Sequence, residues 1–234
     1  MPNYDFASEI SIDITKKCNA SCRMCWRNSS DGRDTSSEVS FPLIEGWKDY
    51  LSRVASISWW GDGEPFMYSD IEKLLEFILL LPQPTHLFST NGRRLAEFAP
   101  VLARANLGEM IISIDGATSR TLEKIRVGVK LDEIIRGIQE LQFQRSLLSL
   151  PPIRFRFLFV SMVDNVSELP LLVKLAWYLR VAAITVTPLV THTVFMNEWQ
   201  CKNVPGLERE FFLSASELAN SLNIEFKHTH PGVL

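Results

Sequence analysis

Three cysteines lie within eight positions near the start of the chain, at Cys18, Cys22 and Cys25. Their C-x3-C-x2-C spacing places three thiolates on one short loop, which suits three corners of an iron-sulfur cube with the fourth iron left open for a ligand. The alternative is a zinc site completed by a fourth side chain, and zinc ligands usually form two separated pairs. The spacing therefore favours iron and sulfur. The candidates for a fourth zinc ligand are Cys201, His86, His192, His228 and His230.

A second run with chemical potential is Gly61-Asp62-Gly63-Glu64-Pro65. Two glycines allow a close approach of backbone groups to a ligand, and the Glu64 carboxylate can accept hydrogen bonds from a cationic amine. The same residue types also make an ordinary turn, which is the simpler interpretation when the run is taken alone.

The elements that must position these residues follow a β/α alternation. Alternating or continuous apolar runs predict six strands, and amphipathic stretches with caps predict helices between them. This order predicts an α/β fold with a parallel sheet, a partial (β/α)6 TIM-like barrel, and no linker suggests a second domain. The expected strands span residues 9–15, 54–60, 86–90, 110–115, 153–163 and 183–187, and the main helices follow at about 93–104, 132–144, 167–179 and 214–222.

In such folds the chemistry lies on the loops after the carboxyl ends of the strands. The cysteines follow the first expected strand and the glycine run follows the second. Polar pairs follow the next three: Asn91-Gly92, Asp115-Gly116 and Asp164-Asn165. The predicted fold thus gathers the candidate residues at one edge of the sheet.

Composition limits the classes of function. The chain has 234 residues, 46% of them hydrophobic, with 24 Lys and Arg against 27 Asp and Glu for a net charge of −3. The apolar fraction suits one sizeable core, and the charge balance gives no broad positive field for nucleic acid. The longest apolar run is only 77–81, and residues 1–5 have neither a basic segment nor the hydrophobic core of a signal sequence. We expect a cytoplasmic protein without a membrane or nucleic-acid partner.

The cysteine loop, with Met24 before its last cysteine and Trp26 after it, resembles the signature of radical S-adenosylmethionine (radical SAM) enzymes. The resemblance implies a 4Fe-4S cluster on the three cysteines, with S-adenosyl-L-methionine chelating the unique iron through its amino and carboxylate groups. It also implies that the backbone around Met24 lies against the adenine. The run from Gly61 to Pro65 resembles the family's Gly-Gly-Glu-Pro motif, which holds the methionyl amine, although Asp62 stands where many relatives have another residue.

Weaker matches imply further cofactor contacts. The stretches Ser89–Gly92, Ser113–Gly116 and Glu123–Gly128 resemble a branch of the family that often carries an extra cysteine-rich SPASM domain. By analogy Ser113 and Asp115 face the ribose or carboxylate. Arg126 either pairs with the carboxylate or is a solvated charge at a helix end. The full set of implied cofactor contacts is Met24, Gly61, Asp62, Gly63, Glu64, Asn91, Ser113, Asp115, Arg126, Asn165 and Pro188, with Glu168 at a matching position.

The resemblance is strongest over residues 8–190. We expect one domain over residues 1–234, with 191–234 as an extension that holds only Cys201 and so cannot supply the several cysteines of auxiliary clusters. The chain is then either a compact enzyme without those clusters or a shortened gene product. A lone cysteine is most often a small buried apolar residue, and we expect this of Cys201.

Two aromatic patterns predict which side chains face inward. Trp59 and Trp60 are neighbours on a strand, so one should face the barrel interior and the other the helices. Phe155, Phe157 and Phe159 form a core stripe. Arg154 and Arg156 lie on the opposite face, where they can bind an anion only if that face lines the cavity.

The resemblance implies reductive cleavage of S-adenosylmethionine to a 5′-deoxyadenosyl radical that abstracts hydrogen from a substrate. The electron would come from a flavodoxin or ferredoxin. The substrate would be a peptide or another molecule suited to a laterally open barrel, and the residues that touch it are not identifiable from sequence. Two alternatives stay open: a zinc-binding interaction module built on Cys18, Cys22, Cys25 and Cys201, and a degenerate S-adenosylmethionine-binding sensor or partner subunit.

Overall fold

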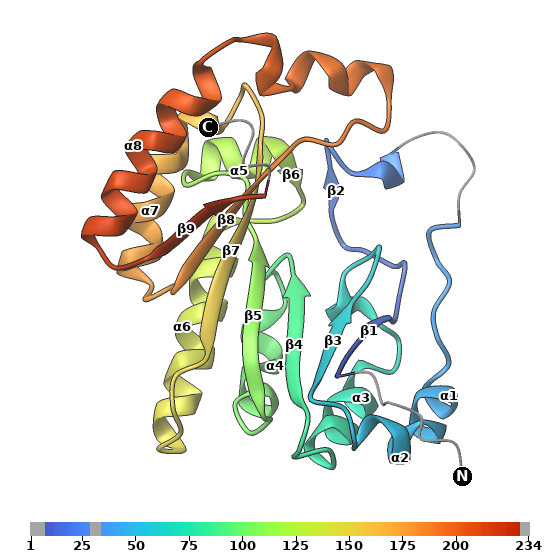
Figure 1. Cartoon of the computed structure of the whole chain (residues 1–234). Coiled ribbons are helices and arrows are strands. Elements are labelled where there is room, and N and C mark those ends of the chain that lie inside the picture. The colour runs from blue at the N-terminus through green and yellow to red at the C-terminus, as the bar shows by residue number, and fades with distance from the viewer. Residues whose placement is uncertain (1–7, 29–33, 230–234) are drawn as a thin grey trace.

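The computed structural model describes residues 8–28 and 34–229, and His230 lies outside them. Its centre is a parallel sheet of seven strands that follow one another in chain order (Figure 1). They are β1 (Glu9–Asp13), β3 (Ser56–Trp60), β4 (Thr85–Thr90), β5 (Leu107–Ser113), β7 (Arg154–Ser161), β8 (Ala183–Pro188) and β9 (Glu225–His228). All six strands predicted from the sequence are present, with ends shifted by a few residues.

Helices connect the strands. The longer ones are α3 (Ile71–Leu79), α4 (Leu95–Leu102), α5 (Ser119–Ile125), α6 (Leu131–Leu147), α7 (Leu169–Tyr178) and α8 (Leu207–Ser221). Short helices α1 (Phe41–Gly46) and α2 (Lys48–Leu51) precede β3, and five 3-10 turns lie in the loops: η1 (Trp26–Asn28), η2 (Pro65–Met67), η3 (Val166–Glu168), η4 (Val194–Trp199) and η5 (Cys201–Asn203). No helix among the described residues is long and apolar enough to cross a membrane.

The two faces of the sheet differ. In Figure 1, helices α3, α4 and α6 lie behind the strands, and the opposite face is turned toward the viewer. Side chains alternate along each strand, so one half packs against the helices and the other half lies on the open face. Trp59 is fully buried on the helix side and Trp60 is 46% exposed, as the alternation predicts.

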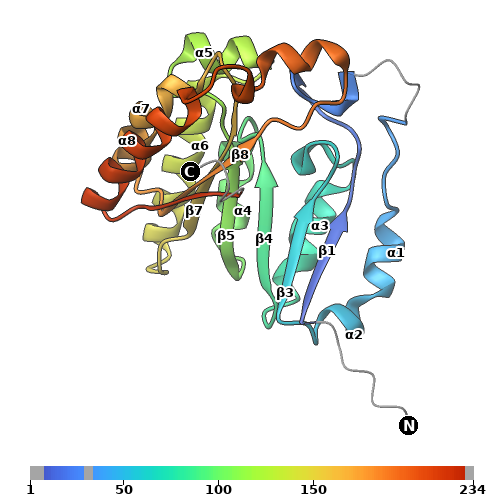
Figure 2. The same cartoon turned by 45° about the horizontal axis from the view of Figure 1, so that its top comes forward.

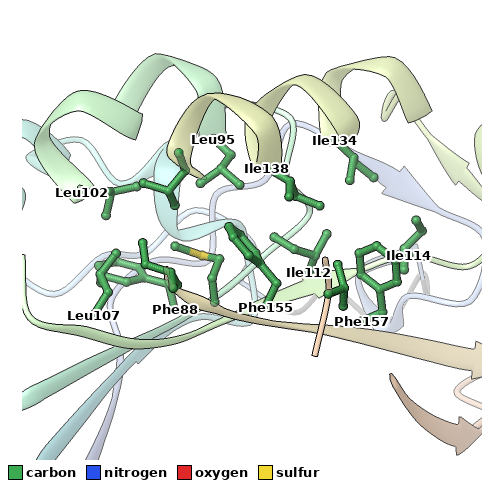
Figure 3. Close-up of a cluster of buried hydrophobic side chains, with 14 of the residues drawn as sticks. Phe88, Leu95, Leu102, Leu107, Ile112, Ile114, Ile134, Ile138, Phe155 and Phe157 are labelled. Carbon is green, nitrogen blue, oxygen red and sulfur yellow. The ribbon is translucent and has the colours of Figure 1, made fainter. Parts of the chain in front are cut away.

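The core fills the space between the sheet and its helices. Figure 3 shows Leu95 and Leu102 of α4 and Ile134 and Ile138 of α6 above Phe155 and Phe157 of β7. Phe155, Phe157 and Phe159 are fully buried, so the predicted core stripe is confirmed. Each such ring contributes roughly 1.5 to 3 kcal/mol of burial free energy, which holds the strands and therefore the loops beyond them in place.

The seventh strand, β9, was not predicted. It has only four residues, and it pairs in parallel with β8 from Ala183↔Glu225 to Val186↔His228. His228 ends this strand, its side chain is fully buried, and its Nε2 lies 3.1 Å from Glu208 Oε1 of α8. The segment after residue 190 therefore belongs to the same sheet as the rest of the chain.

A two-stranded antiparallel sheet lies above the main one. β2 (Ser21–Cys22) pairs with β6 (Arg126–Val127), with Cys22 opposite Arg126. This pairing connects the middle of the cysteine loop to the end of α5. The ends of the main strands point to the same edge, as the arrowheads of β1, β3 and β4 show in Figure 2, so the loops that follow them converge there.

Candidate functional site

The three cysteines line one pocket of about 150 Å³ at the carboxyl ends of the strands. All three side chains are partly buried. The pocket brings together residues from the loops after β1, β3, β4 and β5, as the sequence predicts. Its lining includes the cysteines, Ala20, Arg27, the run Gly61–Glu64, Ser89, Thr90, Asn91, Ser113 and Arg126.

The glycines of the second loop allow it to lie directly on the start of the cysteine loop. A Cβ at Gly63 would stand 2.1 Å from the Lys17 carbonyl oxygen, and one at Gly61 would stand 2.3 Å from that of Thr15. Backbone hydrogen bonds join the same segments, from Gly63 N to Thr15 O at 3.1 Å and from Glu64 N to Lys17 O at 2.7 Å. The space that the two glycines leave is therefore occupied by backbone of the chain itself, not by a ligand.

This contact predicts the effect of adding one methyl group. Gly63→Ala should push the two loops apart, lower the free energy of unfolding by about 1 to 3 kcal/mol and sharply reduce the iron bound after anaerobic reconstitution. Gly46→Ala is the matched control, because a Cβ there meets no heavy atom within 4 Å. Iron content in Gly63→Ala equal to that of Gly46→Ala would show that the contact does not position the cysteines.

Glu38 also holds the cysteine loop in place, and the sequence did not reveal it. Its Oε1 accepts hydrogen bonds from Thr15 Oγ1 and Ser69 N, both at 2.9 Å. Its Oε2 accepts one from Lys17 Nζ at 2.7 Å. Burial alone would raise the Glu38 pKa, but the hydrogen bonds from Lys17 and Ser69 outweigh it and the net shift is downward. Glu38 therefore stays charged and joins three segments beside the pocket.

The Glu64 carboxylate is buried between two loops. It accepts hydrogen bonds from Thr90 Oγ1 at 2.5 Å, Asn91 N at 2.7 Å and Phe66 N at 3.4 Å. Burial raises its pKa, and the hydrogen bonds from Asn91 and Thr90 partly oppose this shift. Glu64 lines the pocket, and its structural role is to bind the loop after β4. Its role toward a methionyl amine stays a prediction.

Asn91 connects that loop to the cysteines. Its Nδ2 donates to Asn19 Oδ1 at 2.8 Å, and the neighbouring Arg93 donates to the Asn19 carbonyl oxygen at 2.9 Å. Asn19 follows Cys18 directly. The loops after β1, β3 and β4 therefore form one hydrogen-bonded unit around the pocket.

Arg126 and Asp115 form a buried ion pair beside the cysteines. Arg126 Nε lies 2.6 Å from Asp115 Oδ2, and the two side chains are 10% and 0% exposed. Asp115 also accepts a hydrogen bond from Val160 N at 2.7 Å. Arg126 Nη1 reaches to 3.9 Å from Cys22 Sγ. The interpretation of Arg126 as a solvated charge at a helix end is therefore wrong.

The charge of Arg126 survives its burial. Burial acts to lower the pKa of the guanidinium, but Asp115 and the nearby Cys22 act to raise it, and the net shift is upward. Burial raises the pKa of the Cys22 thiol to about 11, with Arg126 acting in the opposite direction. Metal binding must therefore displace the proton of this thiol, and the guanidinium beside it favours the thiolate. Three sulfur donors around one pocket with an adjacent cation fit a cluster bound by three cysteines.

Of the other implied contacts, Ser113 lines the pocket. Asp115 is covered by its ion pair with Arg126. Asn165 is fully buried, donates to the carbonyl oxygens of Asp115 and Val160, and accepts from Met162 N. Its amide thus joins the ends of β5 and β7.

Glu168 and Pro188 have other neighbours. Glu168 accepts hydrogen bonds from Ala117 N, Thr118 N and the Thr118 hydroxyl, so it holds the start of α5. Pro188 lines a separate cavity of about 270 Å³. The structure does not bring these two residues to the cysteine pocket.

Met24 belongs to an apolar cluster that supports the cysteine loop from outside. It packs with Ile125, Met162, Leu189 and Met196, with Trp199 at the edge. Met196 and Trp199 lie in η4, which crosses the carboxyl edge of the sheet after β8 (Figure 2). The Arg23 guanidinium lies 4.3 Å from the centre of the Trp199 ring. Sequence patterns gave no signal for this contact, because it joins segments about 175 residues apart only in the folded chain.

Cys201 lies away from the other three cysteines. It is buried in the 270 Å³ cavity with Ser161 and Glu208, and burial raises its pKa to about 12. Among residues 8–28 and 34–229, no three His, Cys, Asp or Glu side chains are arranged to hold a single metal ion. These positions argue against a zinc site made by Cys18, Cys22, Cys25 and Cys201.

Cys201→Ser tests the same point. We expect iron content close to that of the parent and a loss of roughly 1 to 3 kcal/mol in the free energy of unfolding, since a hydroxyl replaces a packed thiol. Iron analysis and urea denaturation give the two values. Loss of iron in this variant would make Cys201 a ligand and contradict the three-cysteine site.

Comparisons with known proteins agree with this geometry. The family model described as "Radical SAM superfamily" matches residues 12–142. A protein named "Probable GTP 3',8-cyclase" from Methanococcus maripaludis (strain C5) is 27% identical over 162 residues, which are 68% of this chain and 51% of that protein. The chain spans about half the length of the curated relatives it matches.

Solved structures show the same fold. Streptococcus suis SuiB bound to S-adenosylmethionine superposes with a TM-score of 0.72 at 17% identity, covering 97% of this chain and 52% of that one. SuiB bound to its precursor peptide SuiA gives a TM-score of 0.71 at 17% identity, covering 97% and 50%. The family model covers more than half of the chain and includes the cysteine loop and the glycine run. The chain therefore belongs to the radical SAM superfamily.

Proposed function

We propose that this chain holds a 4Fe-4S cluster on Cys18, Cys22 and Cys25, binds S-adenosyl-L-methionine beside it, and uses the pair to remove a hydrogen atom from a substrate. The observation that carries the proposal is the single pocket in which the three cysteines meet the Gly61–Glu64 run. When bound, the cluster and cofactor supply reductive cleavage of a carbon-sulfur bond and the hydrogen abstraction that follows.

The residues of the chain would position the cluster and the cofactor and offset part of their charge. The three thiolates would bind three irons, and Arg126 beside Cys22 would offset part of their negative charge. Glu64 is held rigidly by Thr90 and Asn91, so its carboxylate can accept from a cofactor amine without reorganising. Gly61 and Gly63 line the pocket, and because they lack side chains their loop lies directly on the start of the cysteine loop.

The substrate and the electron donor are part of the proposal. SuiB has been solved with a precursor peptide, and the curated relatives are named as GTP cyclases, so a peptide and a small molecule are both represented among similar proteins. We favour a peptide because the sheet is open along one face. A flavodoxin or ferredoxin in the cytoplasm would supply the electron.

The proposal is tested by cofactor cleavage without substrate. The reconstituted chain with dithionite and S-adenosylmethionine should form 5′-deoxyadenosine slowly, and iron-free chain should form none. Absence of 5′-deoxyadenosine from chain that carries its full iron content would support the sensor alternative instead.

Glu64→Ala is the corresponding binding test. Loss of its acceptor oxygens should weaken S-adenosylmethionine binding about tenfold or more, since a charged hydrogen bond contributes roughly 1.5 to 3 kcal/mol. The cluster should remain, because Asn91 and Arg93 still bind Asn19 of the cysteine loop. Glu76→Ala on the exposed face of α3 is the control. Unchanged affinity in Glu64→Ala, measured by equilibrium dialysis, would exclude the amine-binding role.

A further inference from the structure

The open face of the sheet contains a cavity of about 460 Å³ that the cofactor residues do not account for. Its lining residues come from strands β1, β3, β4, β5, β7, β8 and β9. Ser89 lines both this cavity and the cysteine pocket, and Trp60 of the cavity is bonded to Gly61 of the pocket. The two spaces therefore meet, and a ligand in the larger one lies next to the proposed cofactor site.

The cavity has two charged lining residues, and the first is already neutralised. Arg156 Nε lies 3.1 Å from both carboxylate oxygens of Glu109, and its Nη1 lies 3.0 Å from Thr185 Oγ1 and 3.3 Å from Glu225 Oε1. Arg156 does line the cavity, but its guanidinium is shared between two carboxylates. The expectation that it could receive an anion is therefore not supported by its partners.

The second charged residue also has a carboxylate neighbour. Lys227 Nζ lies 3.4 Å from Glu225 Oε1. A polyphosphate needs several cationic donors that can converge on its oxygens. Among the described lining residues, Lys227 and Arg156 are the only cations, and both face glutamates.

The rest of the lining is apolar or carries hydroxyls. Trp60, Leu87, Ile111 and Leu158 give an apolar wall, and Trp60 keeps nearly half of its surface exposed. Ser11 and Ser58 on β1 and β3 add hydroxyl groups that can donate or accept. A half-exposed indole in a concave site is a stacking surface for a ring, and a volume of this size is typical of sites for small ligands.

We propose that this cavity binds an uncharged group of the substrate, an aromatic peptide side chain that stacks on Trp60, and that it does not take a nucleoside triphosphate. The inference rests on the proposed function and specifies the substrate class of the same site. This substrate class would differ from the one in the names of the curated relatives, which are called GTP cyclases, although the sequences match over 162 residues.

Calorimetric binding of three probes to the reconstituted full chain tests the inference. The probes are N-acetyl-L-phenylalaninamide, GTP and inorganic tripolyphosphate, each used at the same concentration. The amide should bind with an affinity in about the millimolar range, and Trp60→Ala should weaken it roughly tenfold, since a stacked aromatic pair adds to the area it buries. Trp177→Ala is the matched control, because Trp177 is 59% exposed on α7 and does not line the cavity.

GTP and tripolyphosphate should bind more weakly than the amide. Three results would overturn the inference: no binding of the amide, amide binding that is equal in Trp60→Ala and Trp177→Ala, or tighter binding of tripolyphosphate that Lys227→Ala weakens. Iron content and 5′-deoxyadenosine formation are measured on the same preparations. If the substrate class is wrong, iron content and 5′-deoxyadenosine formation are still observed. If the proposed function is wrong, these two values are lost, whereas the binding of the amide is still observed.

Discussion

Replacing Cys18, Cys22 and Cys25 together with alanine is expected to abolish iron binding. Parent chain reconstituted without oxygen should hold about four irons, because three thiolates on one loop fit a cube with one open corner. The triple variant has no sulfur ligand left in the pocket, whereas the buried Cys201 lies in another cavity. Iron and sulfide analysis after desalting gives the result.

The same experiment contains its own control. Cys201→Ser should keep about four irons, so the loss in the triple variant can be assigned to the loop rather than to the number of cysteines. Retention of iron by the triple variant would contradict the assignment. A colourless parent that holds stoichiometric zinc would instead show a closed zinc site without radical chemistry.

Breaking the ion pair behind the cysteines should have the second largest effect. Arg126→Met leaves the buried Asp115 carboxyl without its partner at 2.6 Å, and burial raises the pKa of this carboxyl. Loss of one member of such a pair costs about 3 to 5 kcal/mol, and we expect this decrease in the free energy of unfolding from urea denaturation. Iron content should fall as well, since the variant loses the guanidinium that lies 3.9 Å from Cys22 Sγ.

Two further variants show whether the lower free energy of unfolding comes from the broken ion pair. The double variant Asp115→Asn with Arg126→Met should recover part of the stability, because no buried carboxyl is then left without its partner. Lys73→Met breaks an exposed pair with Asp70, in which Lys73 is 65% exposed, and should cost at most about 1 kcal/mol. A change of that small size in Arg126→Met would mean that the buried pair does not support the site.

The sequence predicted the strands well because their signal is local. Alternation in β1 and the phenylalanine stripe in β7 can be read from neighbouring residues, and the loops after these strands hold the site. β9 was missed because Glu225–His228 is short and mostly polar, and it forms a strand by pairing with β8. Short strands of this kind are defined by their partners rather than by their own sequence.

The candidate site was predictable in its centre and less so at its edge. The cysteines and the Gly61–Glu64 run lie together because each follows a strand of the same sheet. Asn165 and Pro188 were named by position in relatives, and the structure gives them other neighbours. Glu38 was missed because its hydrogen bonds reach Thr15 and Ser69 across folded loops, and no local spacing encodes that contact.

The most direct test of the account is low-temperature electron paramagnetic resonance of the reconstituted, dithionite-reduced chain before and after addition of S-adenosylmethionine. We expect the signal of a reduced 4Fe-4S cluster, and a clear change in that signal when the cofactor binds, because three cysteines leave one iron without a protein ligand. Cys201→Ser should show the same change. A cluster signal that the cofactor leaves unaltered, or a chain without any such signal, would contradict the three-cysteine cofactor site.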